Sequence, residues 1–278
     1  MSGTDGMPQA AGPVTIKCFE RGFLSMSRLP LVFGHRGASC DAPENTIPAF
    51  KRAIELGADG VEFDVLLTKD GVPMVMHDDN LSCLTSFRGF MHETLYDDVK
   101  NLDAGSHFGE TWRGEKIPTL SDVLALLKAS SLIPMIELKQ QRGCERAVVE
   151  KVGKLIMQFG LEDRCILSSF SFRILYFCKK LFPHLKRSFL ISRKHFFWFQ
   201  VLLSDLWLHC DYVTPRYDLV TARLISSLKK RQKHCAVWTV NTPKQMEYCM
   251  ELGVESVITD HISLAQKIIK KQETSSVL

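Results

Sequence analysis

The stretch 60–78 reads Gly-Val-Glu-Phe-Asp-Val-Leu-Leu-Thr-Lys-Asp-Gly-Val-Pro-Met-Val-Met-His-Asp and holds two strand-like runs, 60–66 and 73–77. Only residues 67–72 separate these runs, whereas a connection between parallel strands takes about a dozen residues or more. The segment Thr68-Lys69-Asp70-Gly71 between them is typical of a tight turn. The second run is therefore predicted to be a hairpin strand that returns antiparallel to the first.

From Pro30 onward the chain alternates short β-type runs with helical ones, which is typical of a mostly parallel α/β fold. The further strand-like runs lie at 31–36, 133–138, 164–169, 187–191, 211–215, 235–240 and 256–259. When the hairpin strand is set aside, eight runs remain, which is the number in a (β/α)8 barrel of the TIM type. We predict a single-domain α/β barrel with a long insertion, 78–117, after the hairpin strand that ends at His77.

The composition is that of a folded globular protein, with 278 residues, 45% of them hydrophobic, and a net charge of +4. The first thirty residues are rich in Gly, Ser and Pro and lack an apolar core of secretory length, which predicts a loose leader over 1–30. The barrel is expected over 31–270 and a C-terminal tail over 271–278.

Charge and cysteine usage limit the partners and the compartment. The 35 basic and 31 acidic residues include no arginine-rich run and no nucleic-acid motif, which argues against a nucleic-acid partner. None of the nine cysteines forms a Cys-x-x-Cys pair, and several lie in apolar runs, so we expect a reducing compartment and a cytoplasmic location. The oligomeric state is left open.

The run 196–208, Phe-Phe-Trp-Phe-Gln-Val-Leu-Leu-Ser-Asp-Leu-Trp-Leu, is the one stretch whose apolar and aromatic content suggests a membrane contact. It is too short to span a bilayer, which takes about 20 apolar residues. Two interpretations stay open. The run is either a barrel helix that packs on its neighbours or a peripheral contact with a membrane or a lipid chain.

Charged side chains lie in four strand-like runs, where a buried strand should be apolar. These runs are Phe33-Gly34-His35-Arg36, Val61-Glu62-Phe63-Asp64-Val65, Met74-Val75-Met76-His77-Asp78 and Pro134-Met135-Ile136-Glu137-Leu138-Lys139. Residues two apart in a strand share one face, so Glu62 lies beside Asp64 and Glu137 beside Lys139. Because burying lone charges is costly and barrel chemistry lies at the C-terminal strand ends, we expect these side chains to converge there.

The carboxylates Glu62, Asp64 and Glu137 would repel one another on adjacent inward faces unless they are protonated or bridged by a cation. Hard oxygen ligands of this kind suit Mg²⁺ or Ca²⁺. The alternative is that they pair with Arg36 and Lys139 and bind no metal. These two cations would also suit phosphate oxygens, and both of their roles can hold together.

His35 and His77 form a pair of histidines beside carboxylates and cations, which suits general acid and base roles near neutral pH. Phe170 and Trp238 are candidates for the wall of a substrate pocket, with a place in the barrel core as the alternative. No Gly-x-Ser-x-Gly elbow and no phosphate-binding glycine fingerprint occurs, which disfavours a serine hydrolase and a nucleotide site.

Together, these segments resemble the glycerophosphodiester phosphodiesterases, a family of the phosphatidylinositol-phospholipase-C-like barrel group. The resemblance covers about 31–265 in the family's order. The matching segments are Gly34-His35-Arg36-Gly37-Ala38, Ala42-Pro43-Glu44-Asn45-Thr46, Gly60-Val61-Glu62-Phe63-Asp64-Val65, Thr68-Lys69-Asp70-Gly71, Met76-His77-Asp78-Asp79, Ile117-Pro118-Thr119-Leu120, Ile136-Glu137-Leu138-Lys139, Ser168-Ser169-Phe170, Trp238-Thr239-Val240-Asn241 and Ile258-Thr259-Asp260.

The resemblance implies an acid/base pair, three divalent-metal ligands, two phosphate contacts and one further residue near the site. In that order, these are His35 and His77; Glu62, Asp64 and Glu137; Arg36 and Lys139; and Glu44. The implied function is hydrolysis of glycerophosphodiesters to glycerol 3-phosphate and an alcohol through a cyclic phosphate, with Mg²⁺ or Ca²⁺. A lysophospholipase D acting on lysophospholipids and an inactive barrel that binds phosphodiesters remain as alternatives.

Overall fold

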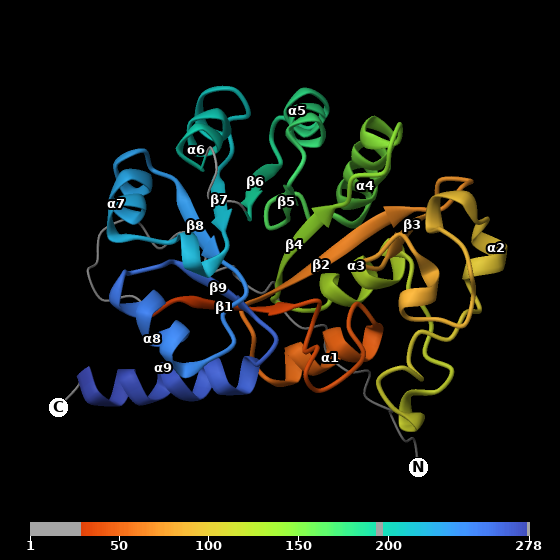
Figure 1. Ribbon diagram of the computed structural model, residues 1–278, viewed down its shortest axis with the longest axis horizontal. Helices are drawn as coiled ribbons and strands as arrows, with labels where there is room; N and C mark the ends of the chain where they lie inside the picture. Colours follow the sequence, from red (N-terminus) through yellow and green to blue (C-terminus); the bar gives the residue numbers. More distant parts are fainter. Residues whose placement is uncertain (1–28, 193–196, 277–278) are drawn as a thin grey trace, which may run out of the picture.

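Eight parallel strands close into a barrel in the computed structural model, which describes residues 29–192 and 197–276 (Figure 1). The barrel strands are β1 (Leu31–His35), β2 (Gly60–Leu67), β4 (Ile133–Leu138), β5 (Ile166–Ser169), β6 (Lys186–Ile191), β7 (Tyr212–Pro215), β8 (His234–Val237) and β9 (Ser256–Thr259). The barrel closes because β1 pairs with β9 on one side and with β2 on the other. The predicted single (β/α)8 barrel is confirmed.

Helices surround the barrel and cover the outward face of its sheet (Figure 1). They are α1 (Ile47–Glu55), α3 (Leu120–Lys128), α4 (Glu145–Phe159), α5 (Phe172–Leu181), α6 (Phe197–Leu206), α7 (Ala222–Lys230), α8 (Pro243–Glu251) and α9 (Ile262–Ser276), with a short 3-10 turn η4 (Tyr217–Leu219) before α7. Threonines cap four of them, because the hydroxyls of Thr46, Thr119, Thr221 and Thr242 accept hydrogen bonds from backbone amides of the first turn.

The hairpin strand β3 (Pro73–Val75) pairs antiparallel with β2, with Val75 opposite Val65. It lies beside the upper part of β2, beyond the point where pairing with β1 stops at His35 and Glu62. The predicted hairpin is confirmed, but the strand ends two residues before His77. The chain turns away there because Asn80 caps a 3-10 helix, its side chain accepting a hydrogen bond from the amide of Ser82.

The insertion after β3 contains only short elements: η1 (Leu81–Cys83), η2 (Met91–Glu93), α2 (Tyr96–Val99) and η3 (Glu110–Trp112). Its buried side chains form a small core together with residues of β2 and β3 and with Met76 just after β3. That core consists of Leu66, Met74, Met76, Leu81, Met91, Val99, Ala104 and Ile117. The insertion is thereby packed against the C-terminal end of β2 and against β3.

Alternation along the strands sorts side chains between the two faces of the sheet. In β2, Val61, Phe63 and Val65 pack outward against the helices, so Glu62 and Asp64 face into the barrel. The lower half of the interior is filled by an apolar cluster that includes Phe33, Met135, Ile166, Ala236 and Ile258. Because this apolar cluster fills the lower half of the interior, the polar side chains of the strands lie at the C-terminal end of the barrel.

Gly60 fixes how closely β1 and β2 approach in the lower half of the barrel. A Cβ atom at this position would lie 2.4 Å from the ring of Phe33 and 2.7 Å from the backbone oxygen of Ile133. Any larger residue would push the strands apart below Glu62 and Asp64.

The aromatic run contributes helix α6, although its first residue, Phe196, and the leader residues 1–28 lie outside the described part of the chain. Within residues 29–192 and 197–276, no helix is both long and apolar enough to cross a membrane.

Candidate active site

Strand register brings the predicted carboxylates together at the C-terminal mouth of the barrel. His35 of β1 lies directly opposite Glu62 of β2, and Asp64 of β2 lies directly opposite Glu137 of β4. Because parallel neighbours in register point their side chains to the same face, these four side chains share the inner surface of the mouth. The convergence expected from the sequence is therefore present.

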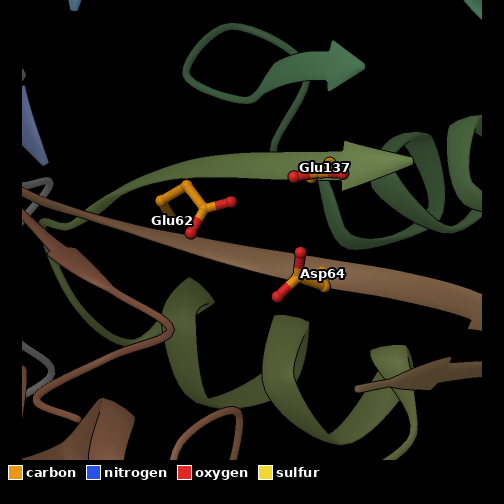
Figure 2. Close-up of side chains that lie close together, drawn as sticks. All are labelled: Glu62, Asp64 and Glu137. Atoms are coloured by element: carbon orange, nitrogen blue, oxygen red, sulfur yellow. The ribbon is translucent and has the colours of Figure 1, made fainter. Parts of the chain in front are cut away.

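Glu62, Asp64 and Glu137 form a buried cluster in which one carboxylate oxygen from each lies within 4.8 Å of the others (Figure 2). Burial, together with the negative charge of Asp64, raises the pKa of Glu62 to about 8 and that of Glu137 to about 7. In the absence of a cation, these carboxylates thus resist ionising together.

Asp64 behaves differently because two cations face it. Burial alone would raise its pKa, but Lys139 and Arg36 outweigh burial and lower the pKa of Asp64 to about 2. Lys139 Nζ lies 3.1 Å from Asp64 Oδ1 and 2.9 Å from Glu137 Oε1. Asp64 is the permanent anion of the cluster, and Lys139 is shared between two of its carboxylates.

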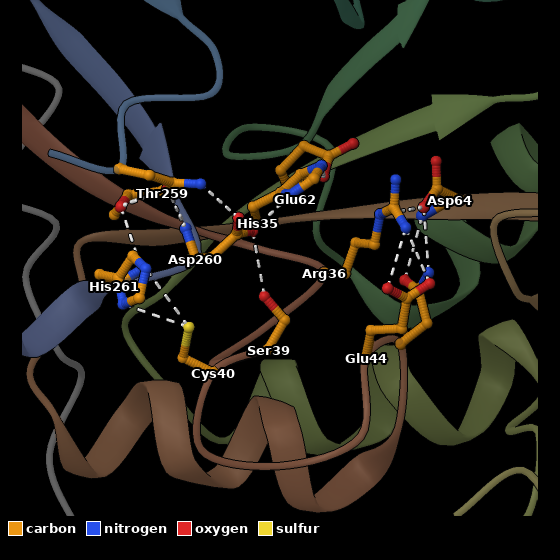
Figure 3. Close-up of polar contacts among 12 residues, drawn as sticks. His35, Arg36, Ser39, Cys40, Glu44, Glu62, Asp64, Thr259, Asp260 and His261 are labelled. Carbon is orange, nitrogen blue, oxygen red and sulfur yellow. Dashed lines mark hydrogen bonds and ion pairs between the residues drawn. The ribbon is translucent and has the colours of Figure 1, made fainter. Parts of the chain in front are cut away.

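Arg36 follows β1 in the left-handed backbone region, with φ of 57°, and its amide donates to the carbonyl of Glu62 at 2.7 Å. Its Nη1 donates to both oxygens of Glu44, at 2.8 and 2.9 Å, and its Nε lies 3.5 Å from Asp64 Oδ2 (Figure 3). Glu44 therefore orients the guanidinium toward the carboxylate cluster.

Asn45 supports this arrangement from the same loop, also with a left-handed φ, of 58°. Its Nδ2 donates to Asp64 Oδ2 at 3.0 Å, and its backbone amide donates to the carbonyl of Arg36 at 2.9 Å. Sequence reasoning assigned no role to Asn45. An asparagine beside the Glu44 position was the available signal, since Asn tolerates this backbone region.

His35 is held by a carboxylate from the far end of the chain. Its Nδ1 lies 2.6 Å from Asp260 Oδ1, and its Nε2 lies 3.9 Å from Glu62 Oε2. Asp260 is itself fixed by Asn241 Nδ2 at 2.5 Å and by the hydroxyl of Ser39 at 3.2 Å. Figure 3 shows His35 between Asp260 and Glu62, so Nε2 is the ring atom directed at the cluster.

Opposite electrostatic effects act on the two histidines. Burial by itself would lower the pKa of His35, but the hydrogen bond to Asp260 and the charge of Glu62 raise it. Burial lowers the pKa of His77, and the nearby cations Lys139 and Arg36 act in the same direction against the opposing charge of Asp64. His35 therefore favours its protonated form and His77 its neutral form, and both lie beside the same carboxylates.

Phe170 and Trp238 come together at the ends of β5 and β8, with ring centroids 5.5 Å apart in an edge-to-face arrangement. Phe170 is 42% exposed, whereas Trp238 packs on the interior cluster and donates from Nε1 to the carbonyl of Thr214 at 3.0 Å. Trp238 is thus partly a core residue, as the alternative interpretation expected, and still borders the mouth.

The donor and acceptor set fits a hard cation and an anionic ligand. Among the described residues, Arg36 Nε, Glu62 Oε2 and His77 Nδ1 are buried side-chain atoms without a hydrogen bond, although His77 Nδ1 lies 3.2 Å from Asp78 Oδ1. Buried polar atoms that lack hydrogen bonds are costly, and oxygen ligands from three carboxylates match Mg²⁺ or Ca²⁺ chemistry. The residues present therefore suit a divalent cation at the cluster and an anion beside Arg36.

Comparison with known proteins agrees with this geometry. A model of the glycerophosphoryl diester phosphodiesterase family matches residues 35–264. The chain belongs to this family. A glycerophosphodiester phosphodiesterase from Caldanaerobacter subterraneus subsp. tengcongensis is 37% identical over 246 residues, which cover 87% of this chain and 98% of the relative. A second, from Bacillus altitudinis, is 35% identical over 243 residues, which cover 85% of this chain and 97% of the relative.

Solved structures show the same family barrel. An Oleispira antarctica phosphodiesterase in complex with the product sn-glycerol-3-phosphate is 30% identical and gives a TM-score of 0.81, covering 87% of this chain and 97% of that one. The glycerophosphoryl diester phosphodiesterase family model begins at His35 and extends past Asp260, so it includes every residue of the cluster described above.

Replacing Glu62 with glutamine is expected to stabilise this glycerophosphoryl diester phosphodiesterase family member at about pH 8 in EDTA. The pKa of Glu62 rises from an ordinary 4.5 to about 8 on folding, so its ionisation opposes folding. This cost is absent below the ordinary pKa and grows as the pH rises toward the folded value. We expect a gain of about 2–4 °C in Tm for each kcal/mol relieved, shrinking toward about pH 5.

Thermal unfolding in EDTA across this pH range measures the effect. Glu247→Gln is the matched control, because Glu247 is exposed on α8, away from the site. A Glu62→Gln protein that melts below the parent at every pH would contradict the electrostatic cost assigned to Glu62.

Proposed function

We propose that this protein hydrolyses glycerophosphodiesters to glycerol 3-phosphate and an alcohol with the help of a divalent cation, Mg²⁺ or Ca²⁺. The observation that carries the proposal is the cluster of Glu62, Asp64 and Glu137, which the strand register brings together. His35 and Lys139 flank this cluster in the same barrel mouth. The named activity of the relatives and the bound product of the Oleispira antarctica structure support the same substrate class.

Glu62, Asp64 and Glu137 would hold the cation, and Arg36 and Lys139 would contact the phosphate. Bound there, the cation would offset the charge of the phosphate and lower the pKa of the attacking hydroxyl. Arg36 keeps its Nε without a hydrogen bond while Glu44 fixes Nη1, so its guanidinium is oriented before a ligand arrives. This preorganisation favours a phosphate oxygen beside Arg36.

His35 and His77 would carry the protons. In the first step, one histidine removes the proton of the neighbouring glycerol hydroxyl, which forms a new bond to phosphorus, while the other protonates the departing alcohol oxygen. The product is a cyclic phosphate. Water then attacks the phosphorus and gives a proton to the second histidine. The ring P–O bond breaks, and the released glycerol oxygen takes the proton held by the first histidine. Both side chains thereby return to their starting states.

Phe170 and Trp238 would line the organic part of the substrate, because their rings meet at the mouth and Phe170 is accessible. A reducing, cytoplasmic compartment is supported by the cysteines, since all those in the described part of the chain are unpaired and most of them are buried.

Release of glycerol 3-phosphate from glycerophosphocholine by the purified protein tests the proposal. We expect release with Mg²⁺ or Ca²⁺, loss of release in EDTA, and recovery when the cation is restored. The Glu62→Gln variant should stay inactive under all of these conditions although it folds.

A parallel assay with lysophosphatidylcholine separates the substrate classes. Release from lysophosphatidylcholine alone would replace glycerophosphodiesters by lysophospholipids, and no release from either substrate by folded protein with any cation would overturn the proposed hydrolysis.

A further inference from the structure

Helix α6 is apolar on both of its faces. Val201 and Ser204 are 2% and 1% exposed and face the barrel, as does Leu208 just beyond the helix. The outward face nevertheless carries large apolar side chains at 40% to 65% exposure. We call this set the α6 stripe: Trp198, Phe199, Leu202, Leu206 and, directly after the helix, Trp207. Packing on the barrel explains the apolar inner face of α6 but not its apolar outer face. A helix with apolar side chains on both faces normally lies in a larger core or in lipid.

The stripe follows one side of the helix. Trp198, Leu202 and Leu206 are spaced four residues apart, and Phe199 lies within the same arc of about 100°. The exposed side chains therefore form a continuous band along α6.

The two helices on either side of α6 carry basic side chains. Figure 1 shows α6 between α5 and α7 on the outside of the barrel. The six basic residues of these flanking helices are Arg173, Lys179 and Lys180 on α5 and Arg223, Lys229 and Lys230 on α7. Arg173 lies on the far side of α5, where its Nη1 is 3.9 Å from Glu145 of α4. The three helices contain one acidic residue, Asp205, which pairs with Arg231 at 3.3 Å and Lys233 at 3.2 Å.

Two of the basic residues contact the stripe itself. The guanidinium of Arg223 lies 5.3 Å from the ring centroid of Trp198, and Lys179 Nζ donates to the carbonyl of Trp207 at 2.7 Å. Helices on other sides of the barrel have a different pattern, since α1, α3 and α4 mix their basic residues with acidic ones. Those acidic residues are Glu55, Asp122, Glu145 and Glu150.

We propose that the α6 stripe docks the protein on an anionic phospholipid surface. Trp, Phe and Leu side chains with flanking Arg and Lys are the combination that binds at a lipid–water interface. The proposal goes beyond the proposed hydrolysis and does not depend on it, because docking is measured without turnover.

Charge argues against a second copy of the chain as the occupant. In a two-fold dimer the same patch faces itself, so the basic borders of α5 and α7 would lie against their own copies. Like charges at such a contact are unfavourable, whereas a negatively charged bilayer complements them.

The position of α6 relates the stripe to the mouth. Each barrel helix starts near the C-terminal end of the preceding strand, so the first residues of α5, α6 and α7 lie at the same end as the active site. Trp198 is in the first turn of α6. Docking through the stripe would therefore lay this side of the barrel on the lipid surface, with the rim of the mouth at the Trp198 end of the contact.

Sedimentation with vesicles tests the docking. With phosphatidylcholine vesicles that contain about 30% phosphatidylserine, we expect the parent to bind, more weakly as phosphatidylserine is removed or salt is added. Leu206→Ser/Trp207→Ser should lower the partition coefficient about 10-fold or more, because two large apolar groups no longer enter the interface. Lys229→Glu/Lys230→Glu should weaken binding to phosphatidylserine vesicles and flatten the salt dependence.

Phe90→Ser/Leu95→Ser is the matched control, because these residues of the insertion are 46% and 47% exposed. It should bind vesicles like the parent, and every variant should keep the parent's turnover of water-soluble glycerophosphocholine. A parent that does not bind phosphatidylserine vesicles at low salt, or a stripe variant that binds equally well, would overturn the proposal. A parent dimer that becomes monomeric in the stripe variant by light scattering would assign the stripe to self-association instead and overturn it too.

Discussion

Replacing His35 with alanine is expected to lower kcat by about 10²–10⁴-fold, the usual contribution of one general acid–base step, while the protein remains folded. The reason lies in the geometry. Asp260 occupies Nδ1 of His35 at 2.6 Å, and the free Nε2 points at the carboxylate cluster. The same loss is expected for His77→Ala, because a proton must be removed at one oxygen and supplied at another. Steady-state kinetics on glycerophosphocholine with saturating cation measures both.

A control histidine separates proton transfer from general damage. His107 is exposed in the insertion, so His107→Ala should keep the parent's kcat and melting temperature. If His35→Ala or His77→Ala retained near-full turnover, that residue would have no role in proton transfer. A loss that followed unfolding by circular dichroism would not count as catalytic.

Replacing Asp64 with asparagine is expected to destabilise the protein by about 3–5 kcal/mol, which is the usual result of removing one partner from a buried ion pair. Asp64 is 1% exposed and balances Lys139 at 3.1 Å and Arg36 at 3.5 Å. Its loss leaves two partly buried cations facing fewer anions. Turnover should also fall to background, because the cluster loses the carboxylate that stays ionised.

The sign of this effect is the opposite of that expected for Glu62→Gln, although both changes remove one carboxylate from the same cluster. Urea unfolding in EDTA at about pH 8 compares the two directly. Lys139→Met in the Asp64→Asn background should recover part of the lost stability, because it removes a cation that has lost its partner. An Asp64→Asn protein as stable as the parent would show that Asp64 does not balance Arg36 and Lys139.

The barrel could be predicted from the sequence because each of its strands is recognisable from a short segment of the chain. Each strand is a short β-type run between helical segments, and the spacing of 60–66 and 73–77 identifies the hairpin without knowledge of the rest. The end of β3 was less predictable. His77 lies beyond the strand because the cap at Asn80 turns the chain, and such local competition is not visible in strand periodicity.

The carboxylate cluster was predictable for a similar reason. Glu62 and Asp64, like Glu137 and Lys139, are two residues apart, and a period of two is sufficient to place each pair on one face. The supporting residues were not. Asn45 acts through a left-handed loop, and Asp260 reaches His35 only because β9 pairs with β1. The available signals for Asp260 were its position directly after the last strand and its place in the matching segment Ile258-Thr259-Asp260.

Closure of the barrel by its first and last strands also affects when the protein becomes active. Chains are synthesised from the N-terminus, so His35 leaves the ribosome long before Asp260 is made. The cluster of Glu62, Asp64 and Glu137 is encoded in the first half, but β1 has no β9 to pair with until residues 256–259 have been added. A nascent chain therefore carries the three carboxylates without a fixed His35. The site is completed only at the end of translation, and any fragment truncated before β9 lacks it.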